Sequence, residues 1–222
     1  MGVLLILLSI GGVIAAVIVA IIALVTKKSW LLKFTFAAVV VWFLFYGVML
    51  VGFSAASTER ELGLNEPKAY CGFYLDCHLH TAVTGVRTSK EIGGLAADGL
   101  FCIVNIKVFS DARNPNIVFR LTTPDASVVD SSGNRYYRDE QAESRLPSAG
   151  IDLGGDIRSH DTIEKEIVFD LPQGVPNPRL DIIDGYGIDH AIDAVLIDDE
   201  DSLFHKRNYF KIREQTETAG VK

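Results

Sequence analysis

Two long apolar runs open the chain. The first extends from Val3 to Val25 and the second from Trp30 to Phe53, and Lys33 is the only charged residue inside either run. About 20 such residues in a helix cross a hydrocarbon core of roughly 30 Å. The four residues between the runs are too few for anything but a tight turn. We therefore predict a transmembrane helical hairpin over residues 1–53, with spans at about 3–25 and 30–53.

The positions of the cations orient this hairpin. Lys27, Lys28 and Lys33 lie in or beside the connecting turn, whereas the flank after the second run offers only Arg60 and then Lys68. Cytoplasmic loops of membrane proteins collect Lys and Arg. We therefore expect an inner (cytoplasmic) membrane protein whose turn faces the cytoplasm. Both termini and the rest of the chain would then lie on the periplasmic, extracytoplasmic side.

A cleaved signal peptide is the alternative interpretation of the N-terminus. Such a peptide has a basic start, one short apolar stretch and a small-residue cleavage site. Here the start is uncharged and the apolar runs are two, although Ser54-Ala55-Ala56 resembles a cleavage site. The pattern favours retained spans.

The first span carries a face of small residues. Gly12, Ala16 and Ala20 recur at four-residue spacing, which lets membrane helices approach closely. This face either packs the two helices of the hairpin together or docks on a larger membrane protein.

Beyond the spans the pattern changes to short alternating segments. In Leu100–Ser110, apolar side chains alternate with Asn105 and Lys107, which predicts a half-buried strand. Further strands are expected at Leu79–Arg87, Ile117–Thr122, Ala126–Asp130, Arg135–Tyr137, Thr162–Leu171, Leu180–Ile183 and Asn208–Arg213, with a helical turn at Asp139–Leu146 and a short helix at Ile188–Leu196. Many short strands favour an all-β, immunoglobulin-like antiparallel sandwich. We place it at residues 69–214, after a linker at 54–68 and before a flexible tail at 215–222.

Charge is divided unevenly between these two parts. All 28 acidic residues lie beyond residue 53, together with all but three of the 21 Lys and Arg, so this part carries a formal charge of −10. Such acidity repels nucleic acid and gains nothing from anionic headgroups. The expected partners are the lipid bilayer and an integral membrane protein complex, and no nucleic acid.

Four stretches carry a resemblance to a known group of proteins. They are Cys71–His78, Phe101–Ser110, Ile167–Pro172 with the following Pro178–Leu180, and Asp198–Lys206. Together they resemble uncharacterised bacterial membrane-anchored proteins with an exported immunoglobulin-like (telokin-like) β-sandwich, and the likeness extends over nearly all of the predicted domain. It implies the fold and assigns no activity.

The densest cluster of potential ligands is Cys71, Cys77, His78 and His80. Outside the cytoplasm cysteines tend to oxidise, so a Cys71–Cys77 disulfide is one interpretation. The other is a copper or zinc site built from the two thiolates with one or both imidazoles. Asp76-x-His78-x-His80 also mimics the start of barrel-fold metal hydrolases, but the strand pattern does not fit such a barrel.

Two further features bear on chemistry. Cys102 shares a face with apolar neighbours and is expected to be a buried, inert thiol. The acidic run Asp198, Asp199, Glu200 and Asp201 is either a solvated loop, a calcium site or a contact surface for a basic partner.

No standard catalytic signature is present. The chain lacks G-x-S-x-G, a phosphate-binding Gly-Lys-Ser/Thr loop, a dinucleotide fingerprint and a haem-attachment motif. We therefore expect a non-enzymatic protein without a cofactor. The function expected is a scaffold subunit that stabilises a larger membrane complex, such as a respiratory or photosynthetic electron-transfer assembly. The alternative is a periplasmic ligand- or metal-binding module that uses residues 71–80.

Overall fold

The computed structural model describes residues 2–70, 77–121, 124–184 and 188–212. The chain divides into two compact units. Residues 1–58 and 189–207 form the hairpin unit, and residues 59–188 and 208–222 form the β unit.

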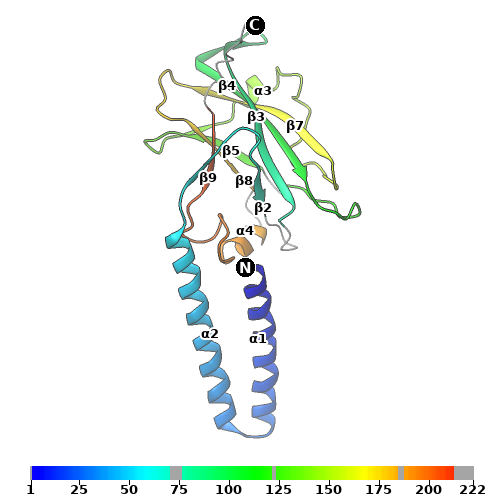
Figure 1. Ribbon diagram of the computed structural model, residues 1–222, viewed down its shortest axis with the longest axis vertical. Coiled ribbons are helices and arrows are strands. Elements are labelled where there is room, and N and C mark those ends of the chain that lie inside the picture. Colours follow the sequence, from blue (N-terminus) through cyan, green and yellow to red (C-terminus); the bar gives the residue numbers. More distant parts are fainter. Residues whose placement is uncertain (1, 71–76, 122–123, 185–187, 213–222) are drawn as a thin grey trace, which may run out of the picture. The chain divides into compact units, whose positions relative to one another are not determined.

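The hairpin unit contains two long apolar helices, α1 (Gly2–Val25) and α2 (Ser29–Ala56), joined by a short turn (Figure 1). Lys27 adopts a left-handed backbone (φ 54°), and Lys28 N donates to Ala23 O at 2.9 Å. At about 1.5 Å per residue, each helix is long enough to cross a bilayer. The two predicted N-terminal apolar helices are confirmed, while the membrane side remains a prediction.

The β unit holds nine strands among the described residues (Figure 1). They are β1 (Arg60–Leu62), β2 (Lys68–Tyr70), β3 (Leu79–Ile92), β4 (Leu95–Ser110), β5 (Asp125–Val129), β6 (Arg135–Tyr137), β7 (Thr162–Leu171), β8 (Arg179–Ile183) and β9 (Asn208–Lys211). One sheet has the order β1-β9-β8-β5-β6 and the other β2-β3-β4-β7. The pairings of these strands are antiparallel except that of β1 with β9.

One hydrophobic cluster is shared by the two sheets. The alternating side chains of β4 enter it, as do Ile167 and Phe169 of β7, while Leu180 and Phe210 come from the other sheet; these four are fully buried. The prediction that Cys102, Val104, Ile106 and Val108 share one face of a strand is confirmed, and Cys102 is a buried thiol. Two mostly antiparallel sheets around a common core constitute a β-sandwich.

The opposite face of the four-stranded sheet is covered as well. Phe101 and Ile103 of β4 and Val168 of β7 are buried there against Ala142 of α3 (Glu140–Glu143) and Leu146. The Asp139 side chain caps α3 by accepting a hydrogen bond from Ala142 N at 2.9 Å.

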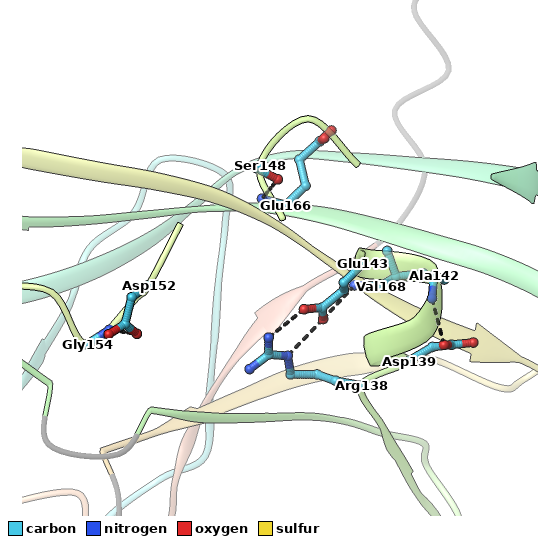
Figure 2. Close-up of polar contacts among 9 residues, drawn as sticks. All are labelled: Arg138, Asp139, Ala142, Glu143, Ser148, Asp152, Gly154, Glu166 and Val168. Carbon is cyan, nitrogen blue, oxygen red and sulfur yellow. Dashed lines mark hydrogen bonds and ion pairs between the residues drawn. The ribbon is translucent and has the colours of Figure 1, made fainter. Parts of the chain in front are cut away.

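The loop around α3 also satisfies the free edge of β7 (Figure 2). Val168 N donates to Glu143 Oε1 at 3.2 Å, Val168 O accepts from Asp139 N at 2.8 Å, and Glu166 N donates to Ser148 Oγ at 3.2 Å. Edge strands are natural templates for unwanted pairing unless they are covered. The α3 loop therefore closes an edge that otherwise exposes its backbone groups.

Several predicted boundaries are wrong. The segment interpreted as a linker at 54–68 contains the end of α2, all of β1 and the start of β2, because Leu62 and Lys68 are both buried. Strand β1 runs parallel to β9 and not antiparallel.

The expected strand at Ile117–Thr122 is also wrong for the residues described. It is reduced to one bridge, in which Phe119 and Ile157 exchange backbone hydrogen bonds of 2.8 and 2.7 Å. The predicted helix at Ile188–Leu196 is shorter, as α4 (Ile188–Asp193). The predicted tail at 215–222 lies outside the described residues.

Candidate functional site

The side chains of His78 and His80 converge on one carboxylate. His80 lies in β3, His78 comes just before that strand, and Asp111 follows the end of the neighbouring strand β4. His78 Nδ1 lies 2.5 Å from Asp111 Oδ1, and His80 Nε2 lies 3.2 Å from the same oxygen without hydrogen-bond alignment. The hydrogen bond from His78 lowers the pKa of Asp111 from its ordinary value. His80 is 14 % exposed and stacks on Phe109, with ring centroids 5.3 Å apart.

This arrangement is a hydrogen-bonded cluster and has no gap for an ion. Metal–ligand distances of about 2.0–2.2 Å on each side leave no place for an ion between two atoms 2.5 Å apart. Among the described residues, no three His, Cys, Asp or Glu side chains are arranged to hold a metal. Cys71 lies outside the described residues, so both its disulfide with Cys77 and the four-ligand metal site stay predictions.

The small residues of α1 line an open groove between the two helices. Gly12, Ala15 and Ala16 contribute from α1, and Thr35 and Ala38 from α2. The groove has a volume of about 490 Å³, and its wall is almost entirely apolar. A methyl group added at Gly12 meets no atom within 4 Å, so this residue does not mediate close packing of α1 on α2. Ala20, the third member of the predicted face, does not line the groove.

A second apolar groove of about 560 Å³ is closed at one end by the returning chain. Residues 189–207 belong to the hairpin unit, and Val195 lines this groove together with Ile6, Tyr46 and Leu50. Tyr46 OH donates to Val195 O at 2.6 Å. The segment 189–207 is therefore seated on the two helices.

The acidic run lies in this returning segment. Asp198 is exposed with a left-handed backbone, whereas Asp199, Glu200 and Asp201 are half-buried. Asp201 N donates to Asp199 Oδ1 at 3.0 Å. Burial raises the pKa of Asp199 to about 6, and the charges of Asp201 and Glu200 act in the same direction, against His205. The predicted contact surface is thus a turn with one exposed carboxylate, and its role in binding stays a prediction.

The raised pKa of Asp199 predicts a pH-dependent stability of this segment. The folded segment holds its proton more tightly than the unfolded one, so stability is present at low pH and is lost as the pH rises from about 4 through about 6. Between pH 7 and pH 5 the opening constant of the segment should fall roughly tenfold. Amide hydrogen exchange of residues 194–203 in detergent should slow by that factor after correction for the intrinsic rate. Asp199→Asn should abolish the change, and an unaltered pH response in that variant would contradict the assignment.

No protein-family model and no curated protein matches this chain. Among solved structures, the secreted protein MPT63 of Mycobacterium tuberculosis is 15 % identical with a TM-score of 0.41, and the match covers 60 % of this chain and 95 % of that one. An uncharacterised β-sandwich protein of Clostridium difficile is 8 % identical with a TM-score of 0.40, covering 71 % and 96 %. A conserved hypothetical protein of Bacillus anthracis is 15 % identical with a TM-score of 0.39, covering 53 % and 90 %.

Two features of the candidate sites were not predicted from the sequence. Asp111 was not singled out, although its place one residue beyond a strand that pairs with His80 is the signal that could have found it. The attachment of residues 189–207 to the helices was also missed. The sequence predicted only a short helix at Ile188–Leu196 followed by an acidic run, and nothing in that pattern indicates the tertiary contact with α1 and α2.

Proposed function

We propose that this chain is an extracytoplasmic subunit, anchored by α1 and α2, that stabilises a larger membrane protein complex. The β unit is an immunoglobulin-like domain held on the periplasmic side. The groove between the helices receives one transmembrane helix of a different membrane protein. The observation that carries this proposal is the open space in front of Gly12.

Helix association in lipid explains why this observation points to a helix. Lipid tails are as apolar as leucine, so burial of apolar surface does not drive association there, and close packing against small side chains does. The groove presents Gly12, Ala15 and Ala16 to one side and Ala38 to the other. The polar pair nearby, Trp42 Nε1 with Ser9 Oγ at 2.9 Å, is already satisfied within the hairpin. The groove therefore fits an apolar helix that carries its own small residues.

Charge favours a different protein over a second copy of this chain as the occupant. The part beyond residue 53 carries a formal charge of −10. Two such domains held side by side at a membrane repel each other, and the repulsion is strongest at low salt. A partner with a basic extracytoplasmic surface is attracted by the same negative charge.

The test is extraction of the tagged full-length chain from its native membrane in a mild detergent, followed by a native gel and mass spectrometry. Co-migration in constant proportion with an integral membrane protein is the expected result. Migration as a single chain, or only with copies of itself, would overturn the proposal.

A ligand- or metal-binding module at residues 71–80 is the second candidate, because His78 and His80 lie close to the same carboxylate of Asp111 and could serve as ligands once the present hydrogen bond is broken. A bound divalent ion must displace the His78–Asp111 hydrogen bond, so this contact competes with the ion for both ligands. Elemental analysis and thiol titration of the purified chain decide the matter. Stoichiometric metal with reactive Cys71 and Cys77 supports this candidate, and metal-free protein with both thiols oxidised rejects it.

A further inference from the structure

The segment 189–207 contacts α1 and α2 at several points along their length. A side chain at Gly2 of α1 would overlap the carbonyl oxygen of Ile197, so only glycine permits this approach. Ser54 Oγ of α2 lies 3.4 Å from Ser202 Oγ, and both residues are buried. Further contacts are Tyr46 OH with Val195 O at 2.6 Å and Lys206 N with Ser57 Oγ at 2.9 Å.

These contacts determine how far along the axis of α2 the segment lies. Trp30 lies in the first turn of α2, and both Tyr46 and Ser54 lie toward its other end. At about 1.5 Å per residue, Tyr46 is about 24 Å and Ser54 about 36 Å from Trp30 along the axis. If Trp30 marks the cytoplasmic boundary of a hydrocarbon core of roughly 30 Å, the outer boundary falls between Tyr46 and Ser54. The chain from Val195 to Ser202 therefore extends across the level of that boundary.

The same segment exposes large apolar side chains next to these contacts. Leu203 is 49 % exposed, Phe204 is 78 % exposed and Val195 is 36 % exposed. Leu203 N donates to Ala194 O at 2.9 Å, which closes the loop that displays them. Phe204 also adopts a left-handed backbone (φ 66°), which costs energy for a bulky residue and is retained where surrounding structure holds it.

We propose that residues 194–204 form an interfacial wedge that inserts Leu203 and Phe204 into the outer leaflet of the bilayer. The inference rests on the anchoring role of α1 and α2 in the proposed function. The occupant of this apolar surface is lipid, because the surface continues that of two lipid-facing helices at the depth where the acyl chains begin. Aromatic side chains with a nearby cation are typical of this level, and exposed Lys206 lies two residues after Phe204.

The wedge gives the anchor a second attachment. A helical hairpin alone has no further attachment at its outer end. Here the chain returns to that end after the β strands, so a part of the sequence distant from the hairpin contacts it. Val195 lines the second apolar groove together with Leu50 and Tyr46.

The experiment uses the full chain reconstituted in phosphatidylcholine vesicles whose acyl chains carry bromine either near the headgroup or near the chain ends. The chain has two tryptophans, so Trp30→Phe and Trp42→Phe together leave a background for Phe204→Trp. Because Phe204 is mostly exposed, this substitution disturbs no packing. We expect blue-shifted emission of the new tryptophan, strong quenching by the shallow bromines, and little quenching by aqueous iodide.

A matched reference separates failure of the wedge from failure of the anchor. Trp30→Phe alone leaves Trp42, which lies about 18 Å from residue 30 and should be quenched best by the deep bromines. If Trp42 is quenched but the tryptophan at 204 is quenched only by iodide, the wedge is rejected and the anchor stands. If neither is quenched by lipid, the anchoring itself is rejected. Deeper quenching at 204 than at 42 would also contradict the wedge.

Discussion

Replacing Glu143 with alanine will lower the free energy of unfolding of the β unit by about 3 kcal/mol, since breaking a buried pair costs about 3–5 kcal/mol by leaving one charge without compensation. Glu143 accepts hydrogen bonds from Arg138 Nε at 2.8 Å and Nη2 at 2.5 Å, and from the backbone N–H of Val168 at 3.2 Å (Figure 2). Its side chain is 6 % exposed and that of Arg138 is 22 % exposed. Because the Arg138 side chain is partly exposed to solvent, we expect a loss of unfolding free energy at the lower end of that range.

The measurement is pulse proteolysis of the full chain in detergent across a urea series. A shift of the midpoint to lower urea is expected for Glu143→Ala, with a smaller shift for Glu143→Gln, which keeps an acceptor for Val168 N. Ser148→Ala is the matched control, because it removes one hydrogen bond from the same β7 edge and should cost about 1 kcal/mol. Equal shifts of the urea midpoint for Glu143→Ala and Ser148→Ala would show that the Arg138–Glu143 ion pair does not contribute to the free energy of unfolding.

Replacing Gly12 with leucine will weaken binding of the membrane protein that we propose as the partner of this chain. The leucine fills the groove where a partner helix is expected, and overpacking of such a contact costs about 1–3 kcal/mol. Because about 1.4 kcal/mol is tenfold in affinity, recovery of the partner should fall roughly tenfold or more. The helix itself is not weakened, since leucine is a better helix former than glycine.

Gly11→Leu is the matched control for this experiment. Gly11 is the adjacent residue and is equally free of atoms within 4 Å, but it does not line the groove. We expect it to leave the recovered partner unchanged by quantitative mass spectrometry. Equal loss in both variants would mean that leucine perturbs the hairpin in general, and no loss in either would place the contact elsewhere.

The sequence was most informative where one periodicity applied to a whole element. The uninterrupted apolar runs became α1 and α2, and the alternation of Cys102, Val104, Ile106 and Val108 identified the central strand. Strand β7, from Thr162 to Leu171, was predicted at its observed bounds, because it alternates and is stopped by Pro172.

Tertiary contacts decided the elements that sequence reasoning missed. Lys68 was assigned to a polar linker, yet its Nζ donates to Ile182 O at 2.6 Å and its side chain is buried between the sheets. Phe101 and Ile103 alternate with the core-facing residues and on pattern alone face solvent; the α3 loop covers them. No local pattern predicts that these side chains are covered, because the covering segment is distant in the chain.

The same limit applies to the candidate sites. The four-residue spacing predicts one face for Gly12, Ala16 and Ala20, and Gly12 and Ala16 line the groove. Whether such a face packs on α2 or stays open depends on the path of α2. The pairing of His78 and His80 with Asp111 depends on the register between β3 and β4.

Photo-crosslinking in living cells shows whether the α1–α2 groove holds a helix of another membrane protein. A photoreactive amino acid at Ala16 lies in the groove, and one at Val17, which is 53 % exposed and outside the groove, is its control. We expect light to link residue 16 to a single membrane protein and to link residue 17 to none or only weakly. Equal crosslinking from both positions, or crosslinks from residue 16 to lipid alone, would contradict it.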